Sequence, residues 1–525
     1  MPKFLTKAQR LGPAALIMAS SVFLSRFMGL LRDKVISYYY GAGPDTDIYF
    51  AAFVIPDFIN YLLAGGYFSI TLIPLMNRYF REDFRHGWRF FSAAFWWVVI
   101  AIATLTLLAW FFAGPLAALS APGFDAAAQE RLAGFIRIIL PAQACFLPGA
   151  CFTALLYMRR QFSVPALTPL IYNGCIIVVG VAFFYIFPGS GMEGFLWGVL
   201  AGAFLGSLLL PFLAVRSKSS GGLRLFMTLQ HPGLRRFILL ALPLMLGQSI
   251  VVLDEAFLRI FGSIGPEGAI SLLNYARRIM MVPVGVVAQA AGVASFPFLA
   301  SLAAAGDRRG FDRTLNAALL TTLAVIIPLA LWMMAAAEPI MRLIFEQGRF
   351  TGADTAVSAA LLAIMLCGVA FWAVQQIIGR GFYANENTLT PVLTGSLATA
   401  LTLPAYFGLA RAFGPYGVAG AGVISLGLYT ALLLWRWQKH YRDEALRGLG
   451  GRALQLTGMG LPCACLAWMI CNLIKNALSG HPLTGSFVSL AVSSLCFGLL
   501  YLLICRYFAP RVWQDVIGQI LRKLR

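Results

Sequence analysis

Long apolar runs follow one another along almost the whole chain, and short polar segments separate them. About twenty apolar residues in a helix span the hydrocarbon core of a bilayer. Only 12% of the 525 residues are charged and 60% are hydrophobic, whereas about a quarter of the residues of a soluble domain are charged. The runs are continuous rather than alternating, which favours helices over a membrane β-barrel. We therefore predict an all-α membrane protein.

The apolar runs predict about fourteen transmembrane helices. Their approximate ranges are 12–39, 47–76, 88–114, 130–158, 166–188, 191–215, 236–261, 268–301, 312–336, 354–384, 388–412, 417–441, 453–476 and 484–508. The first run continues through Arg26 and Arg32 without a small-residue cleavage site, so we expect no cleaved signal peptide.

Basic residues predict the orientation of these helices. The net charge of +19 is concentrated in short loops, which is typical of a topology signal rather than of a nucleic-acid-binding surface. Of the 40 Lys and Arg residues, 28 fall in loops on the side of the N-terminus and six in loops on the other side. The six are Arg131, Arg259, Arg342, Arg349, Arg411 and Lys475. The positive-inside rule therefore predicts that both termini are cytoplasmic.

An internal repeat divides the chain. Seven residues recur 226 positions later, among them Pro165 as Pro391, Thr168 as Thr394 and Gly191 as Gly417. The repeat aligns predicted helices 4–6 with 10–12, which indicates two six-helix lobes of the same orientation. We expect lobes at 1–222 and 223–445, two further helices at 446–508, and a tail at 509–525. One face of the tail is apolar, so it is predicted to be an amphipathic helix at the membrane surface.

Several charged residues interrupt the apolar runs. They are Arg26, Arg32 and Asp33 in the first run, Asp47 and Asp57 in the second, Asp254 and Glu255 in the seventh, and Arg277 and Arg278 in the eighth. A charge within a membrane is costly and usually faces a cavity. Arginine binds phosphate through two parallel N–H groups, so excess arginine indicates a phosphate-bearing ligand. Structural ion pairs, such as Arg32 or Lys34 with Asp33, are the alternative interpretation.

The sequence contains no motif for covalent catalysis or nucleotide binding. The four histidines lie in predicted loops, and no Gly-rich phosphate loop is present. The nine cysteines lie mostly inside apolar runs without metal-ligand spacing. These observations favour a transporter without a cofactor over an enzyme. A scaffold or a glycosyltransferase is less favoured, since such an enzyme needs carboxylates clustered at one membrane face.

The stretch from Ser25 to Leu75, SRFMGLLRDKVISYYYGAGPDTDIYFAAFVIPDFINYLLAGGYFSITLIPL, resembles the opening of the MurJ (MviN) lipid II flippases. NYARRIMMVPVGV from Asn274, LIFEQGRFTGADT from Leu343 and GRGFYANENTLTP from Gly379 are similar to later parts of that family. The resemblance implies the multidrug/oligosaccharidyl-lipid/polysaccharide exporter fold. In that fold two six-helix lobes surround a central cavity, and the two additional helices form a groove for the lipid tail.

The resemblance also implies a set of site residues. The cavity residues that bind the diphosphate and head group correspond to Ser25, Arg26, Arg32, Asp33, Asp47 and Arg278. Asp254 matches the acid of a sodium site, whose polar partners appear here as Thr402 and Tyr406. Three positions depart from the family pattern, because a basic residue is replaced by Asn60 and acidic residues by Gly65 and Met281. The departures leave sodium coupling and substrate identity open.

The resemblance implies a monomeric flippase in the bacterial inner membrane, with lipid II and membrane lipids as its partners. It would move lipid II, the undecaprenyl-diphosphate-linked peptidoglycan precursor, from the cytoplasmic to the outer leaflet by alternating access. A flippase for another polyprenyl-diphosphate-linked oligosaccharide is the alternative. A cation-coupled drug antiporter would need an acidic cavity, which the excess of arginine disfavours.

Overall fold

The computed structural model describes residues 9, 11–64, 67–217, 222–251, 253–441 and 444–508. Within these ranges the chain is helical and contains no strand. Contacts divide it into two compact units, of which unit 1 ends at Gly268 and unit 2 begins at Ala269. The predicted tail at 509–525 lies outside the described residues.

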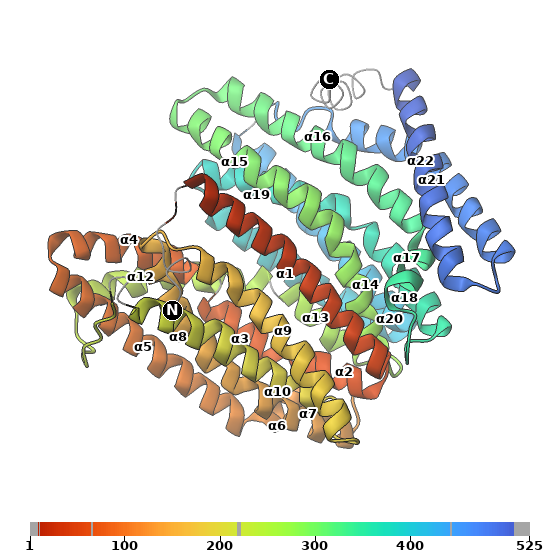
Figure 1. Cartoon of the computed structure of the whole chain (residues 1–525). Helices are drawn as coiled ribbons and strands as arrows, with labels where there is room; N and C mark the ends of the chain where they lie inside the picture. Colours follow the sequence, from red (N-terminus) through yellow and green to blue (C-terminus); the bar gives the residue numbers. More distant parts are fainter. Residues whose placement is uncertain are drawn as a thin grey trace. The chain divides into compact units, whose positions relative to one another are not determined.

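Unit 1 contains thirteen α-helices and two short irregular helical segments among its described residues (Figure 1). They are α1 (Leu11–Tyr40), α2 (Pro44–Ala51), α3 (Val54–Ala64), α4 (Tyr67–Glu82), α5 (Phe84–Phe111), α6 (Ala113–Ser120), α7 (Ala126–Ile139), η1 (Leu140–Ala142), α8 (Gln143–Met158), α9 (Ser163–Ile186), α10 (Glu193–Gly202), the π-helical η2 (Ala203–Leu209), α11 (Leu210–Arg216), α12 (Pro232–Val251) and α13 (Leu253–Gly262).

Unit 2 contains nine α-helices and one π-helical segment in its described part. They are α14 (Ala269–Pro283), η4 (Val284–Ala288), α15 (Gln289–Ala304), α16 (Arg308–Ala335), α17 (Ala337–Phe345), α18 (Gly352–Leu366), α19 (Val369–Ala384), α20 (Leu389–Tyr441), α21 (Leu449–Ala477) and α22 (Pro482–Phe508).

Short local signals begin several of these helices. Asp83, Asp125 and Asp307 each accept a hydrogen bond from the backbone N–H three residues later, at the starts of α5, α7 and α16. Thr351 and Asp354 form a reciprocal capping box at the start of α18. Such caps bond N–H groups that the first turn of a helix leaves without partners. The ends of these helices are therefore set largely by their own sequence.

The apolar segments make this chain a multi-pass membrane protein. In the described residues ten helices are long and apolar enough to cross a membrane, and the bent pair α18 and α19 would make an eleventh. The element α20 contains two predicted spans, 388–412 and 417–441, as two helices that meet at a kink at Gly414. Gly414 has φ 56° and ψ −135°, which only glycine adopts easily. The exact count of fourteen stays a prediction.

One predicted span, 47–76, differs from the structure because it covers α2, α3 and α4, and a turn separates α2 from α3. The span predicted at 236–261 covers α12 and α13. Residues 65 and 66, between α3 and α4, and residue 252, between α12 and α13, lie outside the described residues. Ala52 and Phe53 form a turn between α2 and α3, and Pro56 follows in the first turn of α3, where proline is tolerated. Asp47 lies on α2, Asp57 on α3 and Asp254 on α13.

In unit 1, α8 packs against α3, α4 and α5 and against η2, while α1 lies along α9 (Figure 1). Gly149 of α8 approaches η2 so closely that a Cβ atom there would collide with the Ser207 carbonyl. The helices α12 and α13 pack on α3 and α4. Unit 1 therefore extends beyond residue 222, the predicted end of the first lobe. The predicted lobe boundary at residue 222 was inferred from the sequence repeat, and it stays a prediction.

The described residues 222–231, which precede α12, form no helix, and we call them the strap. The indole N–H groups of Trp96 and Trp97 on α5 donate to the carbonyls of Phe226 and Leu229, both at 3.0 Å. The Phe226 N–H donates to the Ser92 hydroxyl, also at 3.0 Å. Side chains of α5 thus satisfy backbone groups that the strap cannot pair with itself.

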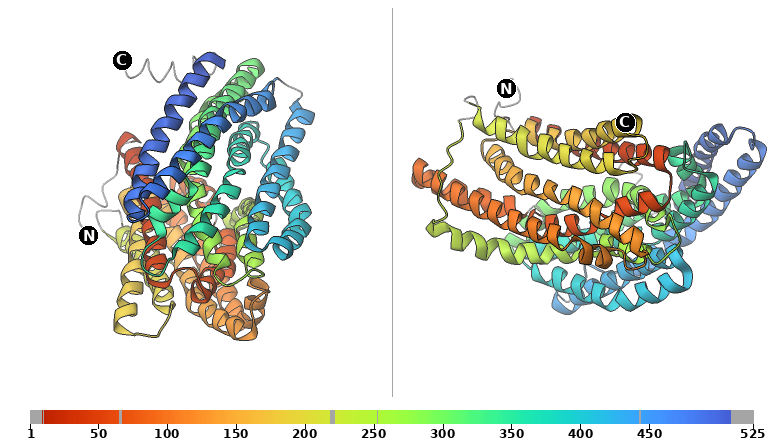
Figure 2. Two further views of the ribbon diagram at one scale, coloured as in Figure 1. Left: turned by 90° about the vertical axis from the view of Figure 1, so that its right-hand side faces the viewer. Right: turned by 90° about the horizontal axis from the view of Figure 1, so that it is seen from below.

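In unit 2, α16 packs against α15, α18, α19 and α21. The helices α21 and α22 form an antiparallel hairpin, visible in blue in Figure 2, and α22 also contacts α17. These are the two additional helices predicted after the sequence repeat. They are attached to unit 2 through α16 and α17.

Candidate functional site

The predicted site residues of α1 lie at two levels of the same helix. Ser25 is half-buried and Arg26 is exposed, whereas Arg32 and Asp33 lie two turns further on. The Arg32 guanidinium contacts one carboxylate oxygen of Asp33 through Nε at 3.0 Å and Nη2 at 2.8 Å. The Arg32 side chain is 14% exposed and that of Asp33 is 3% exposed.

A third bond joins Arg32 to another helix. Its Nη1 donates to the side-chain oxygen of Asn173 on α9 at 3.4 Å, and the Asn173 amide donates to the carbonyl of Pro169. Within the described residues these bonds use three of the five guanidinium N–H donors, so two can serve a ligand. The ion pair that the sequence left as an alternative is therefore present. Asn173 was missed, since an amide in an apolar run carries no charge signal.

Asp47 holds a loop in this structure. It is 3% exposed, and its carboxylate accepts a hydrogen bond from the backbone N–H of Gly268 at 2.7 Å. Gly268 has φ +85°, so the carboxylate fixes the end of a tight turn after α13. This contact gives Asp47 a structural role that sequence reasoning did not foresee.

A buried ion-pair network joins α3 to α13. Arg259 Nη1 lies 2.8 Å from Asp57, and Nη2 lies 2.9 Å from Glu255. Arg259 is 7% exposed. The prediction that Arg259 lies in a loop was wrong, because Arg259 lies on α13, where its two carboxylates allow the guanidinium to be buried. The i, i+4 spacing of Glu255 and Arg259 was a signal that could have found half of this network.

The remaining candidates lie in different parts of the chain. Arg278 is exposed on α14 in unit 2, and its neighbour Arg277 lies over the Trp372 ring at 5.5 Å. Asp254 belongs to α13 of unit 1, and its side chain lies outside what the structure describes. Thr402 and Tyr406 are buried in α20 of unit 2, and the Thr402 hydroxyl contacts that of Ser425 at 3.2 Å. In unit 1 the structure brings Arg32 and Asp33 together.

The departures from the family pattern also fall on helices. Asn60 is half-buried on α3, the helix that carries Asp57, and Met281 is half-buried on α14, one turn after Arg278. Gly65 lies outside the described residues. Unit 1 thus has two polar groups in otherwise apolar segments: one joins α1 to α9 through Arg32, and the other joins α3 to α13 through Arg259. The N–H donors that Arg32 retains can bind an anionic head group.

Comparisons with known proteins agree with this arrangement. The chain is 29% identical over 434 residues to a protein of Rhizobium meliloti named "Probable lipid II flippase MurJ", covering 80% of each chain. It is 28% identical over 501 residues to a Bdellovibrio bacteriovorus protein of the same name, covering 94% of each. The solved structure "Lipid II flippase MurJ, inward closed conformation" has a TM-score of 0.77 at 23% identity, covering 94% of this chain and 99% of its own.

The similarity to that solved structure shows the fold. The sequence model of the family described as "Lipid II flippase MurJ" matches residues 36–492, a range that includes Asp47, Arg278 and most of both units. The chain therefore belongs to the lipid II flippase MurJ family.

Proposed function

We propose that this protein is a flippase that moves lipid II from the cytoplasmic to the outer leaflet of the bacterial inner membrane. The observation that carries the proposal is the family match over residues 36–492. Relatives named as lipid II flippases extend it to 94% of the chain. A flippase makes and breaks no bond, so the protein is a transporter and needs no catalytic residue.

The arginines supply a physical reason for a diphosphate ligand. Arg32 keeps two N–H donors for a ligand, and Arg26 and Arg278 are exposed. Guanidinium groups bind phosphate oxygens more strongly where water is scarce. In the proposed mechanism access to the head-group site alternates between the two leaflets, and the residues that bind the head group are Ser25, Arg26, Arg32, Asp33, Asp47 and Arg278. The protein works as a monomer with both termini cytoplasmic.

The second candidate is a flippase for another polyprenyl-diphosphate-linked oligosaccharide. It is favoured by the departures at Asn60, Gly65 and Met281, which remove one basic and two acidic residues of the family pattern. The diphosphate contacts are the same for both substrates. The sugar and peptide contacts therefore decide between them.

A complementation experiment tests the proposal. The native lipid II flippase of a bacterial host is depleted while this chain is expressed, and both viability and the accessibility of lipid II at the outer leaflet are measured. We expect growth and outer-leaflet lipid II. Normal expression without either result contradicts lipid II transport and favours the second candidate.

A further inference from the structure

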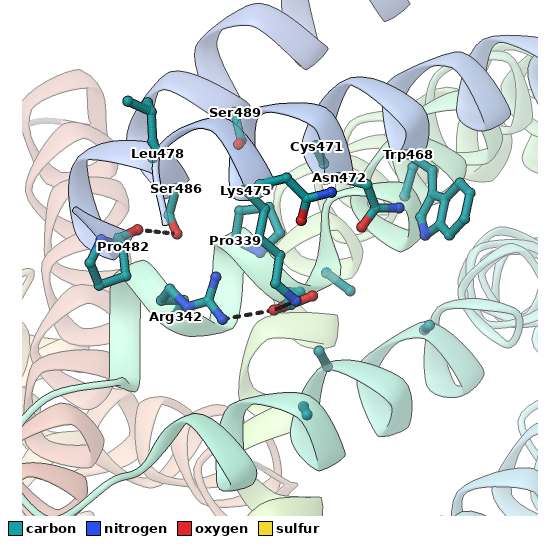
Figure 3. Close-up of a pocket in the computed structure, with 18 of the residues that line it drawn as sticks. Pro339, Arg342, Trp468, Cys471, Asn472, Lys475, Leu478, Pro482, Ser486 and Ser489 are labelled. Atoms are coloured by element: carbon teal, nitrogen blue, oxygen red, sulfur yellow. Dashed lines mark hydrogen bonds and ion pairs between the residues drawn. The ribbon is translucent and has the colours of Figure 1, made fainter. Parts of the chain in front are cut away.

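A pocket in unit 2 lies apart from all of the predicted site residues. It has a volume of about 440 Å³ and lies where α16 ends and α21 turns into α22 (Figure 3). Sites for small ligands have volumes of about 300–1,000 Å³. The apolar floor includes Met334, Pro339 and four alanines on one face of α18. The distribution of basic residues predicts that this is the outer end of unit 2.

Two cations and one carboxylate line the pocket. Lys475 of α21 and Arg342 of α17 both contact the same oxygen of Glu338, at 2.6 Å and 2.7 Å. Arg342 also pairs with Glu346, which does not line the pocket. The Lys475 side chain is 48% exposed, so its ammonium can reach a ligand. Because Glu338 already pairs with two cations, the lining favours binding of an anion over binding of a further cation.

Neutral polar groups surround this charged cluster. Asn472 and Asn476 lie one turn apart on α21, and Ser479 follows in the turn to α22. Within the described part of the chain their side chains form no hydrogen bond. In Figure 3 the Asn472 and Lys475 side chains point into the same space. Amides and hydroxyls in these positions can form hydrogen bonds with phosphate oxygens and with the hydroxyl groups of a ligand.

An exposed apolar surface adjoins the pocket. Trp468 lines the pocket and is 58% exposed, and Met469 and Leu473 of the same helix are also exposed. Tryptophan is enriched where the hydrocarbon core meets the head groups. A ligand whose phosphate contacts Lys475 can therefore lay its hydrocarbon chains along α21. This arrangement favours a lipid over free phosphate.

We infer that this pocket binds the head group of an anionic phospholipid that bears hydroxyl groups, of the phosphatidylglycerol type. The phosphate contacts Lys475, and the head-group hydroxyls contact Asn472 and Asn476. A zwitterionic head group would need an acceptor for its own positive charge, and the carboxylate of Glu338 is already occupied by two cations. The inference does not depend on lipid II transport.

Binding to the purified full-length protein in detergent tests this inference. Dioctanoyl phosphatidylglycerol, dioctanoyl phosphatidylcholine and inorganic phosphate are titrated separately, and their affinities are compared. We expect the phosphatidylglycerol to bind most tightly. Lys475→Ala should weaken its binding about five- to tenfold, because one direct phosphate contact is lost. Glu338→Gln should strengthen it about threefold or more, since both cations are then less neutralised.

Arg447→Ala is the matched control. Arg447 pairs with Glu444 at 3.1 Å on the surface of unit 2, so the variant makes the same charge change away from the pocket. Its affinity should equal that of the unaltered protein. If Glu338 and its two cations have only a structural role, Glu338→Gln should instead lower thermal stability without increasing the affinity for phosphatidylglycerol. That result overturns the inference, as does equal binding of phosphatidylcholine or of inorganic phosphate. If Lys475→Ala fails to fold, the Glu338→Gln result decides.

Discussion

Single residues of α1 and α14 carry the first prediction. Arg26→Ala and Arg278→Ala should each abolish complementation at normal protein levels, because both side chains are exposed and little packing is lost. Arg32→Ala should also abolish complementation. It should lower protein stability as well, since it removes an ion-pair partner of a carboxylate that is 3% exposed. Arg26→Lys should rescue only partly, because an ammonium lacks the planar fork. Growth and membrane protein levels are measured together.

Arg447→Ala is the control, because it removes an exposed arginine far along the chain from these positions. If Arg26→Ala, Arg32→Ala and Arg278→Ala all support growth, the phosphate-binding role of these arginines is wrong. If only Arg32→Ala fails, and its protein level falls, the residue acts through the ion pair with Asp33.

The ion-pair network around Arg259 carries the second prediction. Arg259→Ala leaves Asp57 and Glu255 close together without their shared cation. Removing one partner of a fully buried pair costs about 3–5 kcal/mol. Here we expect a loss of at most about 3 kcal/mol, because both carboxylates are about one-third exposed and solvent screens them. Thermal unfolding in detergent measures the loss. Arg78→Ala, which breaks an exposed pair with Glu82, should cost about 0–1 kcal/mol.

Among the elements, the strap carries a prediction about pH. His231 at its end packs against His86 on α5 with ring centroids 4.5 Å apart, and against Tyr79 on α4. Its Nδ1 accepts the Gly233 N–H at 3.0 Å, a bond that protonation at Nδ1 would remove. Burial first, and then the nearby charges of His86 and Arg89, lower the pKa of His231 to about 4, although Glu82 opposes the shift.

The lowered pKa of His231 determines how the stability of the folded protein changes with pH. Between the ordinary histidine pKa of about 6.5 and the folded value of about 4, the unfolded chain binds a proton that the folded chain does not. The contribution of His231 to the free energy of unfolding is therefore fully present above a pH of about 6.5, and it is lost as the pH falls toward about 4. His231→Phe keeps a ring and cannot be protonated. Melting temperatures at pH 7 and pH 5 should therefore differ less in His231→Phe than in the unaltered protein. An equal or larger difference contradicts this assignment.

For the whole molecule, the basic residues predict which loops face outward. In a variant without its nine cysteines, Ala127→Cys and Arg349→Cys should react with an impermeant thiol reagent applied to intact cells. Arg85→Cys and Arg309→Cys should react only after the membrane is opened. All four positions are exposed in the structure, so differences in reactivity report on the membrane rather than on burial. Labelling of Arg85→Cys or Arg309→Cys in intact cells would overturn the predicted orientation.

The energy source is also a property of the whole molecule. The predicted cavity carries positive charge from Arg26, Arg32 and Arg278. Moving one elementary charge across a membrane potential of 100 mV changes the free energy by about 2.3 kcal/mol. Outward-positive polarity should pull an empty, arginine-rich cavity back toward the cytoplasm. We predict that collapsing the membrane potential stops turnover, while replacing sodium with potassium or choline at fixed potential does not. Outer-leaflet lipid II is measured in vesicles with a potassium and valinomycin clamp. Turnover that follows sodium at fixed voltage would instead favour a sodium site at Asp254.

Local sequence was sufficient to predict the helical membrane fold and the positions of most helices. The apolar runs place α1, α5, α9, α16, α21 and α22 within a few residues of their observed ends. The length and the apolar composition of a run determine whether that run forms a membrane helix. Capping residues such as Asp83 and Thr351 bond to the first turn of the helix that follows them. The sequence also identified Arg32 and Asp33 as unusual, because a charge in an apolar run is costly wherever that run packs.

Only the tertiary structure decided which polar groups meet. Arg259 and Asp57 are 202 residues apart, and Arg32 and Asn173 are 141 apart. No spacing along the chain indicates such pairs, because they depend on which helix faces are brought together by packing. The same holds for the strap on α5 and for the pocket around Lys475, whose walls come from separate helices. The cost of burying a charge depends on the apolar residues beside it, so the sequence reveals it. The residue that pairs with the charge comes from another helix, so only the tertiary structure reveals it.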